Sequence, residues 1–111
     1  MNAEELKNKI REIFGKQIVF NDEFDYYAKS IHNIDESLIV WCISIKERKI
    51  PPISKSKLGD RIVFIKKIGS SDRCLVIKIK NGDFQEIHLA DHVYYNKLTR
   101  DLGIKNSSET Y

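Results

Sequence analysis

Apolar residues recur at helical spacing at the start of the chain. Leu6, Ile10 and Phe14 fall on one side of a helix, separated by polar and charged residues. Asn2 precedes this stretch, and Glu5 follows three residues later, which is typical of a capping box. The pattern therefore predicts an amphipathic N-terminal helix over residues 2–14, followed by a glycine that suits its end.

A short β-branched stretch, "KQIVF", covers residues 16–20 and predicts a strand. After it, Asn21 or Asp22 can cap a second helix, in which Phe24, Ala28 and Ile31 have helical spacing.

The segment "DESLIVWCISIKERK", residues 35–49, fits two elements, since its apolar run could form a buried strand or a helix. Its acidic start, basic end and length favour a helix, whose dipole those charges would stabilise. Two prolines then predict a loop over residues 51–60.

Three strand-like runs follow in close succession: "RIVFIKKI" (61–68), "RCLVIKIK" (73–80) and "DFQEIHL" (83–89). The last two are joined by Asn81-Gly82, the pair favoured in type I′ hairpin turns because both central residues need positive φ. The runs predict an antiparallel meander. Asp91 then caps a final helix that ends near Gly103.

This order of elements predicts an α+β fold. We expect N-terminal helices packed on one face of a curved antiparallel sheet of about four strands, followed by a short C-terminal helix. The other face of the sheet would stay partly open. No linker divides the chain, so residues 1–105 are expected to form one domain, with residues 106–111 as a flexible tail.

Composition is typical of a soluble domain. The chain has 111 residues, of which 41% are hydrophobic and 32% charged, enough for one modest core. No apolar run approaches the roughly 18 residues of a membrane span, and no signal peptide is visible, so we expect a cytoplasmic protein. Cys42 and Cys74 are far apart and flanked by apolar residues, which favours buried reduced thiols.

Positive charge is concentrated in the middle of the chain. Residues 46–80 carry eleven cationic and three acidic side chains, whereas the whole chain has a net charge of only +3. Such asymmetry is typical of proteins that bind a phosphate backbone or an acidic partner. A solvated lysine-rich surface is the alternative.

Basic and aromatic residues are also frequent along and just beyond the three predicted strands. This set consists of Arg61, Lys66, Lys67, Arg73, Lys78, Lys80, His88, His92, Tyr94 and Tyr95. RNA cleavage without a metal needs a base for the 2′-hydroxyl proton, a cation for the phosphate and an acid for the leaving oxygen. These residue types can supply such groups, and aromatic rings can stack on unpaired bases. The chemical signal is weak, however, and ordinary surface residues are the favoured interpretation of the set.

A metal site is not expected. His88 and His92 flank Asp91, but their spacing would suit a metal only on one continuous helix, and His88 lies in a predicted strand. We expect no cofactor either.

Two stretches of the chain resemble a known family. They are "KQIVFNDEFDYYAKSI" and "KLGDRIVFIKKIGSSDRCLVIKIKNGDFQEIHLADHVYYNKL", and with the helix between them they span Lys16 to Leu98. The order of elements, the "LGDR" entry to the meander, the arginine that opens its central strand and the ending "HVYYNKL" are similar to the RelE/ParE superfamily of toxins. The helix over residues 2–14 is additional to that pattern.

The resemblance implies a small toxin neutralised by a cognate antitoxin protein. The RelE branch cuts messenger RNA on the ribosome without a metal, whereas the ParE branch inhibits DNA gyrase. A non-catalytic module of the same fold that binds nucleic acid or protein is a further alternative. The resemblance leaves the oligomeric state open.

The resemblance also suggests roles for individual residues. Arg73 would stabilise the scissile phosphate, Lys66 and Lys67 would contact phosphate or transfer a proton, His92 would act as base or acid, and Tyr95 matches the C-terminal tyrosine. Arg61, Lys67, Lys78, Lys80 and Tyr94 would bind RNA. Strand parity places Arg73 on the more apolar face, so we expect it to reach an open site only from the end of its strand or across a bulge.

Overall fold

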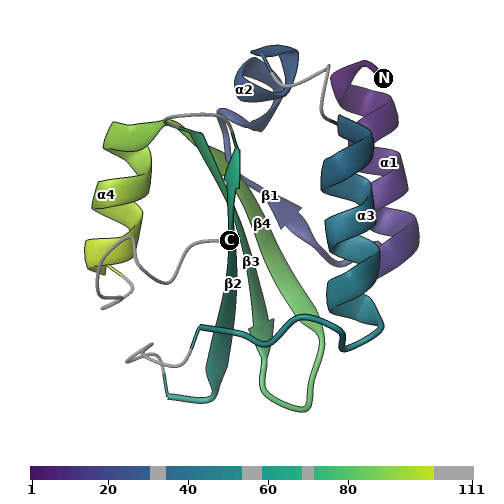
Figure 1. The fold of residues 1–111 in the computed structure, drawn as a ribbon, viewed down its shortest axis with the longest axis vertical. Coiled ribbons are helices and arrows are strands. Elements are labelled where there is room, and N and C mark those ends of the chain that lie inside the picture. The colour runs from purple at the N-terminus through teal and green to yellow at the C-terminus, as the bar shows by residue number, and fades with distance from the viewer. Residues whose placement is uncertain (31–34, 54–58, 69–71, 102–111) are drawn as a thin grey trace.

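The computed structural model describes residues 1–30, 35–53, 59–68 and 72–101. A four-stranded sheet stands between helices on both of its faces (Figure 1). The helices are α1 (Ala3–Phe14), α2 (Phe24–Ser30), α3 (Asp35–Lys46) and α4 (His92–Asp101). The strands are β1 (Val19–Phe20), β2 (Arg61–Ile68), β3 (Asp72–Ile79) and β4 (Phe84–Ala90), in the spatial order β1-β4-β3-β2. The predicted α+β class is confirmed.

The sheet is mixed, which corrects the expectation of an antiparallel one. Strands β2, β3 and β4 form the predicted antiparallel meander, but β1 lies parallel to β4, with Val19 opposite Glu86. Strand β1 is also shorter than the stretch over residues 16–20. The side chain of Asn21 continues the pairing, because its Nδ2 donates to the Leu89 carbonyl at 2.8 Å and its Oδ1 accepts from the Leu89 amide at 3.0 Å.

Helix α1 begins with the predicted capping box. Asn2 Oδ1 accepts a hydrogen bond from the Glu5 amide at 2.8 Å, and Glu5 Oε1 accepts one from the Asn2 amide at 3.3 Å. Leu6, Ile10 and Phe14 are buried, as their spacing predicted. The helix therefore contributes its apolar side to the core, against α2 and α3.

Within segment 35–49, residues Asp35–Lys46 form helix α3, so the prediction of a helix is confirmed. Its end is a Schellman motif, in which the Lys49 amide donates to the Ser44 carbonyl at 2.8 Å and the Arg48 amide to the Ile45 carbonyl at 3.0 Å. Arg48 occupies the left-handed position of this motif, with φ of 61°. Glycine is the usual residue at this position because it has no Cβ.

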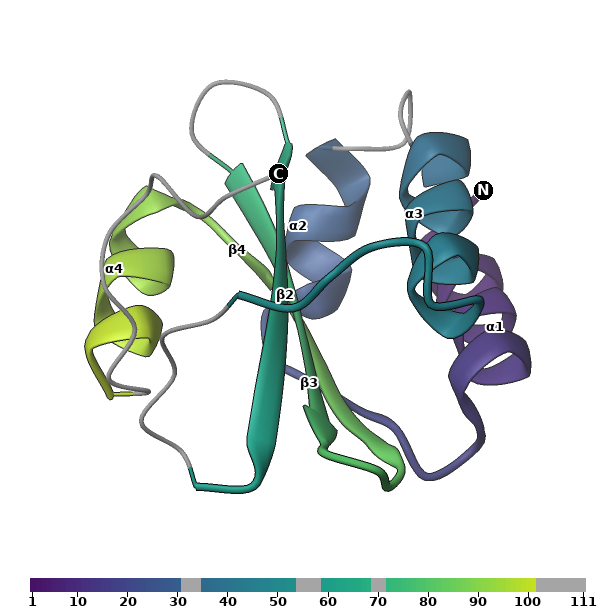
Figure 2. The same cartoon turned by 60° about the horizontal axis from the view of Figure 1, so that its bottom comes forward.

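Helices cover both faces of the sheet (Figure 2), and a separate core of buried side chains lies on each face. Phe64 and Val76 face α1 and α3, whereas Ile65, Leu75 and Ile77 face α4. Helix α4 therefore covers the face that we expected to stay partly open. The reason is that Arg73, Leu75 and Ile77 alternate with residues of the first core, so this second face is itself largely apolar.

The hairpin between β3 and β4 forms where predicted, but its turn is of a different type. Asn81 has positive φ (62°), whereas Gly82 does not, so this is not a two-residue type I′ turn. The Gly82 amide instead donates to the Ile79 carbonyl at 2.8 Å, in a longer connection.

Cys42 and Cys74 are buried free thiols, as predicted. Burial raises the pKa of Cys42 to about 12 and that of Cys74 well above its ordinary value. In the described part of the chain, no helix is both long and apolar enough to cross a bilayer. The predicted positions of Ile31, Gly103 and the tail over residues 106–111 lie outside the described residues.

Candidate functional site

The strand register brings several polar side chains to the face of the sheet that packs against α4. Lys67 lies opposite Arg73, which in turn lies opposite Ala90 on β4. Two residues further along β3, on the same face, Leu75 lies opposite His88. Arg73 and His88 are therefore diagonal neighbours, and such pairs are about 7–8 Å apart, with their Cβ atoms somewhat closer.

Arg73 is buried, and no acidic side chain in the described part of the chain forms an ion pair with it. Its side chain is 7% exposed, and its guanidinium carbon lies 5.3 Å from the ring centroid of Tyr95. Nη1 donates to the carbonyl of Asp72 at 2.9 Å, but Nε is buried and has no hydrogen-bond partner among the residues that the structure describes. Among the ion pairs of the described residues, none includes Arg73.

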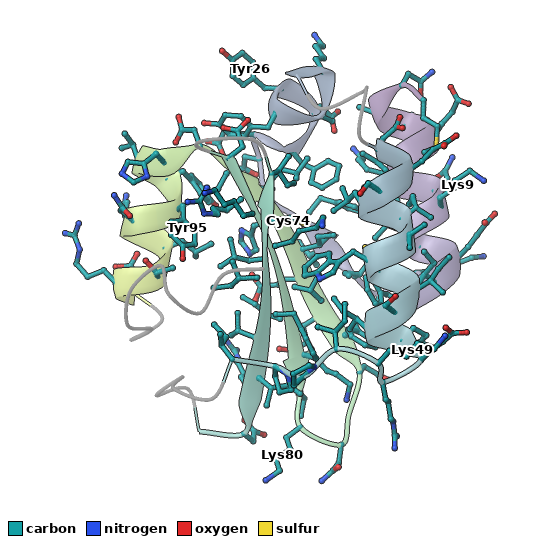
Figure 3. The ribbon with its side chains drawn as sticks, in the orientation of Figure 1. Lys9, Tyr26, Lys49, Cys74, Lys80 and Tyr95 are labelled. Carbon is teal, nitrogen blue, oxygen red and sulfur yellow. The ribbon has the colours of Figure 1, made fainter. Side chains whose placement is uncertain are left out.

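An arginine in this state retains donors that an anion could satisfy. Guanidinium N–H groups match the geometry of phosphate oxygens, and the interaction is strengthened where water is excluded. Tyr95 lies on the side of α4 that faces the sheet and is 4% exposed (Figure 3). Its ring fixes one side of the guanidinium and adds a cation–π contact.

His88 links a carboxylate to a phenol. Its Nε2 lies 2.9 Å from Glu86 Oε1, and its Nδ1 lies 3.2 Å from the hydroxyl of Tyr94. Glu86 and His88 are two residues apart on β4, so both side chains point to the α4 face. We call these three residues the Glu86–His88–Tyr94 chain.

The direction of proton donation in this chain follows from Glu86, because an ionised carboxylate can only accept a hydrogen bond. Burial, followed by the negative charge of Glu23, raises the pKa of Tyr94, so its hydroxyl keeps its proton at neutral pH and can donate it. In a neutral His88, Nδ1 then accepts from Tyr94 and Nε2–H donates to Glu86. A carboxylate that holds the tautomer of a histidine in this way is a common arrangement for a general base.

Asp91 sets the start of α4 and thereby the place of Tyr94. Asp91 Oδ1 accepts a hydrogen bond from the Tyr94 amide at 2.8 Å, which confirms the predicted cap. This bond lowers the pKa of Asp91, and a hydrogen bond from the Tyr27 side chain lowers it further. Tyr27 lies in the middle of α2, so Asp91 connects the start of α4 to α2.

The structure divides the predicted site residues between two faces. Arg73, Lys67, Tyr94 and Tyr95 lie on the α4 side, whereas Lys66 and Lys78 point to the α3 side. Neighbouring strand residues face opposite ways, so Lys66 and Lys67 cannot share one site. Lys66 is close enough to Cys42 and Cys74 to affect the pKa of both thiols.

The remaining predicted residues lie away from this cluster. Arg61 begins β2, six residues from Lys67, which is about 20 Å along a strand. Lys80 is exposed beyond the end of β3. His92 is exposed on α4, where its Nε2 lies 3.2 Å from the Asn96 amide nitrogen.

From the sequence, His88 belonged to the basic and aromatic set but was assigned no role in the site. Glu86 was not predicted as a site residue. The signal was present as "EIH" in a predicted strand, since residues two apart share a face. In the part of the chain that the structure describes, no three His, Cys, Asp or Glu side chains cluster in a way that could hold a metal ion.

Searches of protein-family models, curated proteins and solved structures return no match to this chain.

Proposed function

We propose that the chain is a RelE-like toxin, a metal-independent endoribonuclease that cleaves ribosome-bound messenger RNA in the cytoplasm and so inhibits translation. A cognate antitoxin would neutralise it. One observation carries the proposal: buried Arg73, with no acidic partner among the described residues, lies diagonal to His88, which contacts a carboxylate and a phenol.

The proposed reaction is attack of a ribose 2′-oxygen on the adjacent phosphorus. Tyr94 accepts the 2′-hydroxyl proton while passing its own proton to Nδ1 of His88, and Glu86 stabilises the imidazolium that results. The bond from 2′-oxygen to phosphorus forms and the bond from phosphorus to the 5′-oxygen breaks. The products are a 2′,3′-cyclic phosphate and a 5′-hydroxyl end.

Positive charge is needed where the pentavalent phosphate develops. Arg73 would supply it from the start of β3, with its guanidinium held against Tyr95. Lys67 is exposed beside Arg73, so its ammonium group is available to contact the phosphate and to protonate the leaving 5′-oxygen. Lys66 and His92 have no part in this version of the site.

The test is controlled expression in bacteria, followed by primer extension on cellular messages. We expect growth arrest and cuts at regular codon positions with the wild-type chain, and loss of both with His88→Gln or Tyr94→Phe. His92→Gln is the matched control and should cut like the wild type. Normal growth with intact messages, at a good level of soluble wild-type protein, would contradict the proposal.

The burial of Arg73 also favours a second candidate, a non-catalytic module of the same fold that binds nucleic acid or protein. In that case the Arg73–Tyr95 contact would serve mainly to fix α4 on the sheet. Salt-sensitive RNA binding without any cleavage would support this candidate. Inhibition of gyrase supercoiling without RNA cleavage would instead point to the ParE-like activity.

A further inference from the structure

Two adjoining hollows lie between the C-terminal end of α3 and the β3–β4 hairpin. Both are lined by Ile45, Arg48, Lys78 and Phe84, so they form one continuous depression. Lys78 points to the α3 side of the sheet. The depression is therefore on the opposite face from Arg73 and the Glu86–His88–Tyr94 chain.

The two hollows differ in chemistry. One has a volume of about 270 Å³, and Pro52, Ile62 and Phe64 make its walls apolar. The other has a volume of about 380 Å³ and is lined by Lys46 and Asp83 in addition to the shared residues. We call them the apolar compartment and the basic compartment.

Lysines surround an aromatic ring between the compartments. Lys46 Nζ lies 5.8 Å and Lys78 Nζ lies 5.4 Å from the ring centroid of Phe84. Lys78 also donates to the carbonyl of Ile79 at 3.1 Å. These contacts hold two cations of different elements, α3 and β3, at the same depression.

Cations around the depression outnumber the acids. Among the described lining residues, the cations are Lys46, Arg48, Lys78 and Lys80, and the one acid is Asp83. None of the four cations takes part in an ion pair of the described residues, whereas the neighbouring Lys49 pairs with Glu47 at 3.1 Å. Like charges gathered in a concave site repel one another and attract anions.

Arg48 is held at this place in a strained conformation. Its φ of 61° is unfavourable for a residue with a Cβ, by about 1–2 kcal/mol. Glycine would relieve the strain and end the helix equally well. Strained residues of this kind are concentrated at ligand sites, and Arg48 lines both compartments.

We propose that this depression binds a small ligand of the nucleoside phosphate class. The phosphates would lie in the basic compartment, among Lys46, Arg48 and Lys78, and the flat base would lie in the apolar compartment. The basic hollow falls within the usual range of small-molecule pockets, about 300–1,000 Å³. The inference does not depend on the ribonuclease proposal, because it concerns other residues on the other face.

Calorimetric titration of the full chain with ADP, GDP, CDP and UDP, each separately, tests the site. We expect at least one nucleotide to bind about tenfold or more tightly than inorganic pyrophosphate, which lacks the apolar group. Arg48→Gly and Lys78→Gln should each weaken that binding by about tenfold or more. Lys49→Ala, one residue along the same turn, should leave it unchanged.

Thermal melting separates loss of the site from loss of the fold. Arg48→Gly should melt at or above the wild-type temperature, since it removes the strained φ. The proposal is overturned if no nucleotide binds, if pyrophosphate binds as tightly as the nucleotides, or if binding survives Lys78→Gln. It is also overturned if a short single-stranded RNA binds here while all four mononucleotides do not.

Discussion

The guanidinium carbon of Arg73 lies 5.3 Å from the ring centroid of Tyr95, so the residue at the start of β3 is covered by helix α4. The contact joins the sheet to the C-terminal helix and shields a positive charge from water. In the proposed reaction, that charge stabilises the phosphate, but it is costly for the fold because its Nε has no hydrogen-bond partner among the described residues.

Arg73→Met should therefore separate activity from stability. The substitution loses a cation–π contact of about 0.5–2 kcal/mol but removes a buried unsatisfied donor that costs about 1–3 kcal/mol. We expect the free energy of unfolding, measured in urea, to stay within about 1 kcal/mol of wild type or to rise, while RNA cleavage is lost. A loss of more than about 3 kcal/mol would instead identify Arg73 as a structural anchor.

Asn21 should be important for stability although it lies at the edge of the sheet. Its amide satisfies both the N–H and the carbonyl of Leu89. Asn21→Ala leaves these two groups unpaired, and we expect a loss of about 2–5 kcal/mol in the free energy of unfolding. Asn8→Ala is the control, because the Asn8 side chain only accepts an exposed bond from Arg11 at 2.9 Å. Equal losses in both variants would contradict the role of Asn21.

The cap at Asp91 should give stability that depends on pH. At neutral pH, Asp91→Ala should cost about 1 kcal/mol, as at other helix N-caps. The pKa of Asp91 in the fold is below its ordinary value of 3.8, so the ionised cap contributes fully above that pH. Its contribution is lost as pH falls through the lower, folded pKa.

Urea denaturation of the wild type and Asp91→Asn between pH 7 and about pH 3 measures this effect. Asparagine also caps helices but carries no charge, so the stability difference between the two proteins should shrink as the pH falls. A difference that stays constant over this range would show that the charge of Asp91 does not matter.

Local patterns predicted much of this fold because they depend on neighbouring residues. The run at residues 61–68 forms strand β2 with the bounds that its sequence predicted, and Asn2 caps α1 in the expected way. The parallel pairing of β1 with β4 could not be predicted in this way. Val19 and Glu86 are far apart in the sequence, and a strand as short as β1 has little pattern of its own.

The candidate site was predicted only in part, for a related reason. The alternation of side chains along β2 places Lys66 and Lys67 on opposite faces of the sheet, and Lys67 shares its face with Arg73. It does not reveal which of the two faces α4 covers. The contact between His88 and Tyr94 joins a strand to the following helix, so it depends on how α4 folds back on the sheet. The "EIH" pattern was the one local sign of it.

The matched pair Lys66→Ala and Lys67→Ala tests the central claim most directly. The two residues are adjacent and of the same type, but they point to opposite faces of the sheet. We expect primer extension to show that Lys67→Ala reduces cleavage about tenfold or more, because one charged contact with the phosphate is lost. Lys66→Ala should leave cleavage unchanged. Cleavage that depends on Lys66 and not on Lys67 would place the active site on the other face and contradict the account.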